Sequence, residues 1–382
     1  MAATVSSVGP AARRAEPFDG SGLVIVAEQT SELGGAERVI AAIVDRYPRA
    51  SVLAPEFTQT PIPAGARLPY AHRTKTVWEG GVRRHHLLPL YARRMRQVRA
   101  EGAAVVLSVA SHGWAMAVGV PAGARHLAYY FGPSPSLYTR SNGYLRAYPA
   151  PARPLIRAAL PALRSFERGL LRLPHRVIAN SGWASAEIAR VHGRRPEVIH
   201  PPVRTDFFTP AEREREHLLL VGRLVHHKRI EAAVEAFRSL GAELVVAGHG
   251  PLLDRLRAGA PPNVRFTGYV EDAELRELYR RSRALICPSP EEFGIVMAEA
   301  QACGTPVIAP RKGGALEIVR EGETGLLLEL ADPRSIAAAV GELDRRAFDP
   351  AACRASAERF SQERFAARIG RVLDGELRRV AS

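Results

Sequence analysis

Two glutamates in one short segment could hold the two ends of an elongated ligand. Glu291 lies in an expected loop, and Glu299 lies eight positions later, inside a helix expected to begin near Gly294. The first carboxylate can project toward the far end of a ligand, while the second stands more than one helical turn below it. An acidic helix start with a solvated second glutamate would give the same spacing.

The backbone at the start of that helix offers a site for an anion. The N–H groups of Gly294, Ile295 and Val296 have no partner inside the helix, and the helix dipole favours a negative group such as a pyrophosphate there. Glu292 and Phe293 precede these amides in the same loop, so we include them in the candidate ligand-binding set.

Two basic residues and one histidine extend the candidate site. Arg223 and Lys228 lie in the loop between a strand and a helix, where they can neutralise a diphosphate leaving group. The alternative is that Arg223 and Lys228 are ordinary solvent-exposed surface residues without a ligand. His112 follows an apolar strand at 103–108, and a satisfied structural histidine is the competing interpretation.

The elements around these residues alternate between apolar strands and amphipathic helices. That order predicts parallel sheets covered by helices, whose ligands bind beyond the carboxyl ends of the strands. A chain of 382 residues can bury two cores, so two domains are expected. Gly34 and Gly35 lie at the first strand-to-helix turn, where a backbone without side chains can approach a phosphate or sugar, although any tight turn can use glycine.

These motifs resemble the family 4 glycosyltransferases, which are retaining, nucleotide-sugar-dependent enzymes of GT-B fold. The family signature, Glu-x7-Glu followed by Ala-x-Ala-Cys-Gly-x-Pro-Val, is matched by EEFGIVMAEAQACGTPVIA. Together with KGGALEIV, this stretch is most similar to the GDP-mannose-using α-mannosyltransferases of polysaccharide assembly. The resemblance implies that Glu291 holds sugar hydroxyls and Glu299 the nucleotide ribose.

Other segments extend the resemblance over most of the chain. GGAER with Gly34 and Gly35 is similar to the N-terminal glycine loop of the family, and Gly248 and Gly250 are similar to its nucleotide-contacting loop. The pattern Gly-Arg-Leu…Lys around Arg223 and Lys228 also matches. His112 lies where the mannosyltransferase subgroup has Ser-His.

The resemblance implies an α/β chain of GT-B fold, with two Rossmann-like, doubly wound domains facing a cleft. Residues 1–21 are expected to be a disordered arm. Residues 22–205 form the N-terminal, acceptor-binding domain, joined by a return helix at 362–382. Residues 206–361 form the C-terminal domain that binds the nucleotide sugar.

Three departures from the family pattern are evident. Met297 stands where the subgroup often has proline, and Arg204 where it often has aspartate. The run Phe131-Gly132-Pro133 replaces His-Thr-Pro, so an imidazole that would touch the donor sugar is missing. This change puts the usual substrate contacts and the usual acceptor in doubt.

The net charge of +14 belongs to the first part of the chain. Residues 1–200 hold 26 Lys+Arg against 12 Asp+Glu, and the rest balances at 27 against 27. Such a surplus of positive charge favours binding to an anionic membrane or an anionic acceptor. A genome rich in G and C encodes many arginines, and this bias would give the same surplus without any binding function. Without a recognised binding motif, nucleic acid is not expected as a partner.

Two segments could carry a membrane contact. The stretch 83–99 places leucines among arginines but is interrupted by Pro89, and a helix packed on its own sheet is the alternative. Residues 134–175 are rich in proline and arginine and could build acceptor access. No signal peptide or spanning segment is expected. Three cysteines without a CxxC pair fit a reducing cytoplasm and give no metal site.

A cytoplasmic enzyme is expected, and peripheral contact with the inner face of the membrane is one of the two interpretations of its basic half. The resemblance implies retaining transfer of a hexose, mannose from GDP-mannose, onto a lipid-linked or polysaccharide acceptor, and the basic residues and helix amides make a metal unnecessary for it. No cofactor beyond the nucleotide sugar is expected. Two alternatives remain: a UDP- or dTDP-sugar enzyme acting on a small natural product, and a GT-B scaffold that binds nucleotide sugar without transferring it.

Overall fold

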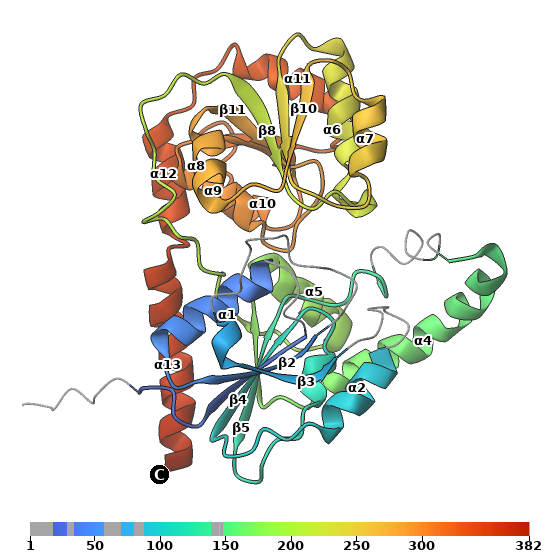
Figure 1. The fold of residues 1–382 in the computed structure, drawn as a ribbon, viewed down its shortest axis with the longest axis vertical. Coiled ribbons are helices and arrows are strands. Elements are labelled where there is room, and N and C mark those ends of the chain that lie inside the picture. Colours follow the sequence, from blue (N-terminus) through green and yellow to red (C-terminus); the bar gives the residue numbers. More distant parts are fainter. Residues whose placement is uncertain are drawn as a thin grey trace, which may run out of the picture.

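The computed structural model describes residues 18–28, 34–56, 70–79, 88–138, 145 and 148–381. Most of the expected N-terminal arm lies outside these residues. The described chain forms two lobes, each built on a parallel sheet (Figure 1). The prediction of two doubly wound, Rossmann-like domains is confirmed.

The first sheet has seven parallel strands in the order β3-β2-β1-β4-β5-β6-β7. The central strands β1, β4 and β5 are buried on both faces, as expected for a sheet covered by helices. The strands are β1 (Leu23–Ala27), β2 (Ser51–Glu56), β3 (Thr74–Glu79), β4 (Val105–Ala110), β5 (Arg125–Tyr130), β6 (Arg176–Ala179) and β7 (Glu197–Val198). The main helices of this lobe are α1 (Gly35–Arg46), α2 (Leu88–Gln97), α4 (Arg153–Leu170) and α5 (Gly182–His192).

The second sheet has six parallel strands in the order β10-β9-β8-β11-β12-β13. The strands are β8 (His217–Val221), β9 (Leu244–Ala247), β10 (Val264–Gly268), β11 (Ser282–Ile286), β12 (Val307–Pro310) and β13 (Gly325–Leu328). The helices are α6 (Ile230–Ala236), α7 (Leu253–Gly259), α8 (Asp272–Arg280), α9 (Ile295–Ala302), α10 (Ala315–Ile318), α11 (Pro333–Leu343) and α12 (Pro350–Glu358). In both sheets the strand order reverses beside the first strand, which is where ligands of such folds bind.

The last helix, α13 (Gln362–Ala381), returns to the first lobe (Figure 1). Phe365, Ile369 and Leu373 are buried in the core that lies between the first sheet and α1. Asp374 accepts a hydrogen bond from the Tyr47 hydroxyl at 2.7 Å. The N-terminal domain is therefore built from two separate stretches of chain.

The first turns of α1 and α2 have local causes. Helix α1 begins at Gly35, directly after the glycine turn, because the Glu37 carboxylate reaches back to the Gly34 N–H at 2.9 Å. Pro89 does not interrupt α2. It lies in the first turn, where a backbone N–H has no intrahelical partner to lose.

Helix α2 packs on its own domain, as one of the two alternatives predicted. Leu88, Tyr91 and Met95 are buried in the core between the sheet and α4. The arginines of α2 lie on its outer face. All three cysteines, Cys287, Cys303 and Cys353, are buried as free thiols.

Candidate active site

The signature loop brings together two of the predicted catalytic residues. Glu291 lies between β11 and α9, and its Oε2 is 2.5 Å from Nζ of Lys228. Lys228 ends a single turn of 3₁₀ helix after β8, the strand beside β11 in the sheet. The Ser289 hydroxyl donates to Oε1 of Glu291 at 2.9 Å. Glu291 is thus held by a cation and a hydroxyl from two neighbouring strand ends.

A glycine turn supports the backbone of this loop. The Gly314 N–H donates to the Glu291 carbonyl at 2.9 Å. A Cβ at Gly313 would lie 2.2 Å from the same carbonyl oxygen, and one at Gly314 would lie 2.0 Å from the Phe293 carbonyl oxygen. Only glycine permits this approach, so the KGG sequence fixes where Glu291 stands.

Helix α9 begins against the N-terminal glycine loop. Gly294 caps the helix with φ of 96°, in the left-handed region. A Cβ on Gly35 would be 3.3 Å from Cδ1 of Ile295, so Gly35 of the first lobe reaches the first turn of α9. The side chain of Phe293 packs in the core of the second domain, so a donor contact from Phe293 would have to come from its backbone.

Glu299 is buried and has partners on both carboxylate oxygens. Oε1 pairs with the guanidinium of Arg38, from α1 of the other domain, and Oε2 accepts from the Tyr279 hydroxyl at 3.2 Å. Burial raises the pKa of Glu299, and the positive charge of Arg38 opposes that rise. The Arg38 guanidinium also lies 3.6 Å from Asp272. Ribose binding by Glu299 remains a prediction, and it requires Arg38 to give up Oε1.

The Arg223 loop lies against the second glycine loop. Gly248 and Gly250 have φ of 142° and 152°. A Cβ at Gly248 would be 1.9 Å from the Gly222 carbonyl oxygen, and the Leu224 N–H donates to the His249 carbonyl at 2.8 Å. The two loops after β8 and β9 therefore meet backbone to backbone, with Arg223 exposed between Gly222 and Leu224.

His112 lies at the carboxyl edge of the first sheet and is held by a buried acid. Oε2 of Glu28, the residue after β1, accepts the N–H groups of Ser111 and His112 at 2.9 and 2.8 Å. The same oxygen lies 3.2 Å from Nδ1 of His112. A protonated Nδ1 would leave Nε2 as the basic nitrogen. Sequence reasoning missed Glu28, although its place directly after an apolar strand was a usable signal.

A second buried acid holds the loop that follows β5. Glu167 of α4 accepts the N–H and the hydroxyl of Ser134 at 3.0 and 2.5 Å, and the Tyr130 hydroxyl at 3.2 Å. Burial raises the pKa of Glu167, and its hydrogen bonds with Ser134 oppose this. The run Phe131-Gly132-Pro133 is thus fixed by a helix that carried no sequence signal for this role.

Within the described ranges, no three His, Cys, Asp or Glu side chains come together as metal ligands. Independence from metal remains a prediction.

Residues 215–345 match the family model described as Glycosyl transferases group 1. The D-inositol 3-phosphate glycosyltransferase of Thermobispora bispora is 32% identical over 259 residues, 58% of this chain and 60% of that protein. That of Acidothermus cellulolyticus is 32% identical over 211 residues, 46% of this chain and 47% of that protein. The chain thus spans about half the length of the curated relatives it matches.

Solved structures resemble the chain over nearly its whole length. Anabaena Alr3699/HepE in complex with UDP-glucose has a TM-score of 0.68 at 18% identity and covers 92% of this chain and 99% of that one. The sucrose-phosphate synthase of Thermosynechococcus elongatus has a TM-score of 0.63 at 20% identity, covering 94% and 98%. The fold is GT-B, as predicted.

The Arg38–Glu299 pair can be tested by a double-mutant cycle with Arg38→Met and Glu299→Gln. Because the carboxylate is buried, each single change should destabilise the fold, and the two should couple by about 1 to 3 kcal/mol in denaturant unfolding. The surface pair Arg265–Glu243 is the matched control and should couple far less, because both side chains are exposed. Additive effects at Arg38 and Glu299 would mean that the pair is not formed in solution.

Proposed function

We propose that this chain is a retaining glycosyltransferase that moves a hexose from a nucleotide sugar onto an acceptor held by the first domain. The observation that carries the proposal is the contact between Lys228 and Glu291, formed where the loops after β8 and β11 meet beside the start of α9. This contact at the carboxyl edge of a Rossmann-like sheet supports a role for Glu291 in holding the sugar and for Lys228 in balancing the diphosphate.

The donor would be bound mainly by the second domain. Arg223, Lys228 and the first amides of α9 supply positive charge for the diphosphate, so its departure needs no metal from the protein side. In the transfer, the bond from the sugar C1 to the phosphate oxygen breaks and a bond from C1 to the acceptor oxygen forms. The acceptor proton passes to the leaving phosphate, and the new bond forms on the face that the phosphate leaves.

GDP-mannose is the donor that the signature segments favour, with a lipid-linked saccharide or polysaccharide as acceptor. Relatives named as D-inositol 3-phosphate glycosyltransferases, and a neighbour solved with UDP-glucose, keep a UDP-sugar and a small acceptor as the alternative. The surplus of arginine in the first 200 residues suits an anionic acceptor of either kind. Loss of the His-Thr-Pro segment at Phe131-Gly132-Pro133 favours the small acceptor.

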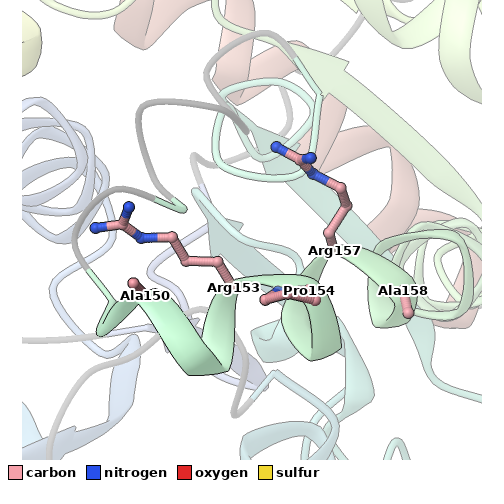
Figure 2. Close-up of a pocket in the computed structure, with 5 residues that line it drawn as sticks. All are labelled: Ala150, Arg153, Pro154, Arg157 and Ala158. Atoms are coloured by element: carbon pink, nitrogen blue, oxygen red, sulfur yellow. The ribbon is translucent and has the colours of Figure 1, made fainter.

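Peripheral membrane contact is proposed for the outer face of α2 and α4, two helices that contact one another. Leu155 on α4 is 76% exposed and Leu90 on α2 is 46% exposed, each among arginines. Figure 2 shows Arg153 and Arg157 rising from α4 beside a shallow pocket, lined also by Ala150, Pro154 and Ala158. In the described part of the chain, no helix is long and apolar enough to cross a bilayer.

Thermal stabilisation by GDP, UDP, dTDP and their sugars tests the donor. A ligand that binds only the folded state raises the free energy of unfolding by mass action, and so raises the melting temperature. At a ligand concentration about one hundred times its Kd, the gain in the free energy of unfolding is about 2.7 kcal/mol. A shift with GDP and GDP-mannose alone would support the mannosyl donor. A preference for UDP or dTDP would overturn the GDP-mannose assignment in favour of the enzyme acting on a small acceptor. No shift with any of these ligands would favour the GT-B scaffold without transferase activity.

Substitutions at the Lys228–Glu291 pair test the site. Glu291→Gln should lower turnover by about 100-fold or more, while nucleotide affinity changes little, because the carboxylate is assigned to the sugar. Lys228→Met should weaken nucleotide binding as well. Exposed Glu274→Gln and Lys75→Met are the matched controls and should behave like the unmodified chain. Unchanged turnover in both site variants would disprove the assignment.

Co-flotation with vesicles tests the membrane contact. The unmodified chain should float with phosphatidylserine-containing vesicles and not with neutral ones, and the bound fraction should fall with salt. Leu155→Glu should abolish flotation. Leu330→Glu, at a 56%-exposed leucine of the other domain, is the control and should leave it unchanged. Equal binding by Leu155→Glu would show that α4 is not the contact.

A further inference from the structure

A carboxylate of the second domain accepts hydrogen bonds from the start of a helix in the first domain. Glu317 of α10 accepts the N–H groups of Gly182 and Trp183, the first two residues of α5, at 3.0 and 3.1 Å. These N–H groups have no partner inside their own helix, and the helix dipole favours an anion there. Ser181, the N-cap of α5, accepts the Ala184 N–H at 3.0 Å.

The same carboxylate is tied to the segment that joins the two domains. His200 lies between β7 and β8, and its Nε2 is 2.8 Å from Oε2 of Glu317. The imidazole packs on the rings of Phe293 and Phe360, with centroids 5.6 and 4.9 Å away. Burial by itself would raise the pKa of Glu317, but the hydrogen bonds from His200 and the two amides outweigh it and hold the pKa below its usual range.

The start of α5 also touches the signature loop directly. The Ser181 hydroxyl donates to the Glu292 carbonyl at 2.6 Å. From the other side, the Gly314 N–H donates to the Glu291 carbonyl. The backbone around Glu291 is therefore held between α5 of the first domain and the glycine turn that leads into α10. Glu317 connects these two segments, because it belongs to α10 and accepts hydrogen bonds from α5.

We propose that Glu317 is a positioning residue that docks α5 on the signature loop and so sets Glu291 against the donor sugar when the two domains close. The inference rests on the proposed function, because it gives Glu317 a role in the same reaction. The KGGALEIV segment would then act at two points, with its glycines beneath Glu291 and its glutamate on the opposite domain. Docking of α5 would transmit domain closure to the sugar and leave the nucleotide contacts unaffected.

Glu317→Gln is the primary variant, because the amide keeps the shape while one oxygen becomes an NH₂ group that cannot accept. Affinity for the nucleotide alone should change less than about twofold, since Arg223 and Lys228 belong to the loop after β8 and not to α5 or α10. The extra affinity that the sugar confers should be lost, and kcat should fall by about tenfold or more, because a misplaced loop costs positioning.

His200→Gln is the second variant and should show the same pattern. Combined with Glu317→Gln it should add little further loss, because the two residues act as one unit. Glu323→Gln is the control, since Glu323 is an exposed residue of the same segment that pairs with Arg320. It should leave every readout unchanged.

Small-angle scattering without ligand provides a readout independent of activity. Glu317→Gln should increase the radius of gyration if the contact with α5 holds the domains together. Unchanged sugar-dependent affinity and kcat would overturn the proposal. Parallel loss of thermal stability and nucleotide affinity would also overturn it, because a purely structural role predicts that pattern. If the unmodified chain bound no nucleotide, the proposed function and the positioning role would both fail, while scattering would still report whether Glu317 docks α5.

Discussion

Close approach of backbones at the carboxyl edge of the second sheet is the constraint on which the rest of the site depends. Gly248 and Gly250 put the loop after β9 directly on the loop that carries Arg223, and Gly313 and Gly314 put the turn after β12 directly under Glu291. A side chain at any of these positions would meet backbone atoms at 2.9 Å or less. Because backbone yields less easily than a side chain, these contacts fix the relative positions of the backbone segments that carry Arg223 and Glu291.

Charge across the interface between the domains then completes the arrangement. Arg38 reaches Glu299, and Glu317 reaches the start of α5, so charged side chains cross the interface in both directions. The two contacts differ in what a donor would require of them. A ribose would have to displace Arg38 from Glu299. The contact of Glu317 with α5 can persist while a donor is bound, because Glu317 is also held by His200 in the segment that joins the two domains.

Much of the fold and part of the site could be predicted from sequence. Regular alternation of apolar strands and helices is a local pattern, and it gave two parallel sheets. Glu291 and Lys228 were found through motifs. Arg38 and Glu28 were not, because their roles depend on partners 261 and 84 positions away, on Glu299 and His112, and local patterns carry no information about such pairing. Phe293 lies in the motif, yet its side chain belongs to the core.

The return of α13 to the first lobe has a consequence for the order in which the domains can form during synthesis. The second domain is one continuous stretch and can complete its core as soon as Phe360, just after α12, has left the ribosome. The first domain must wait for Phe365, Ile369 and Leu373, which fill its core from a helix that follows the second domain in the chain. Until then, the apolar face beside α1 stays open to solvent. The first domain is translated before the second but completes its core after it, so it is exposed to chaperones and proteases for longer.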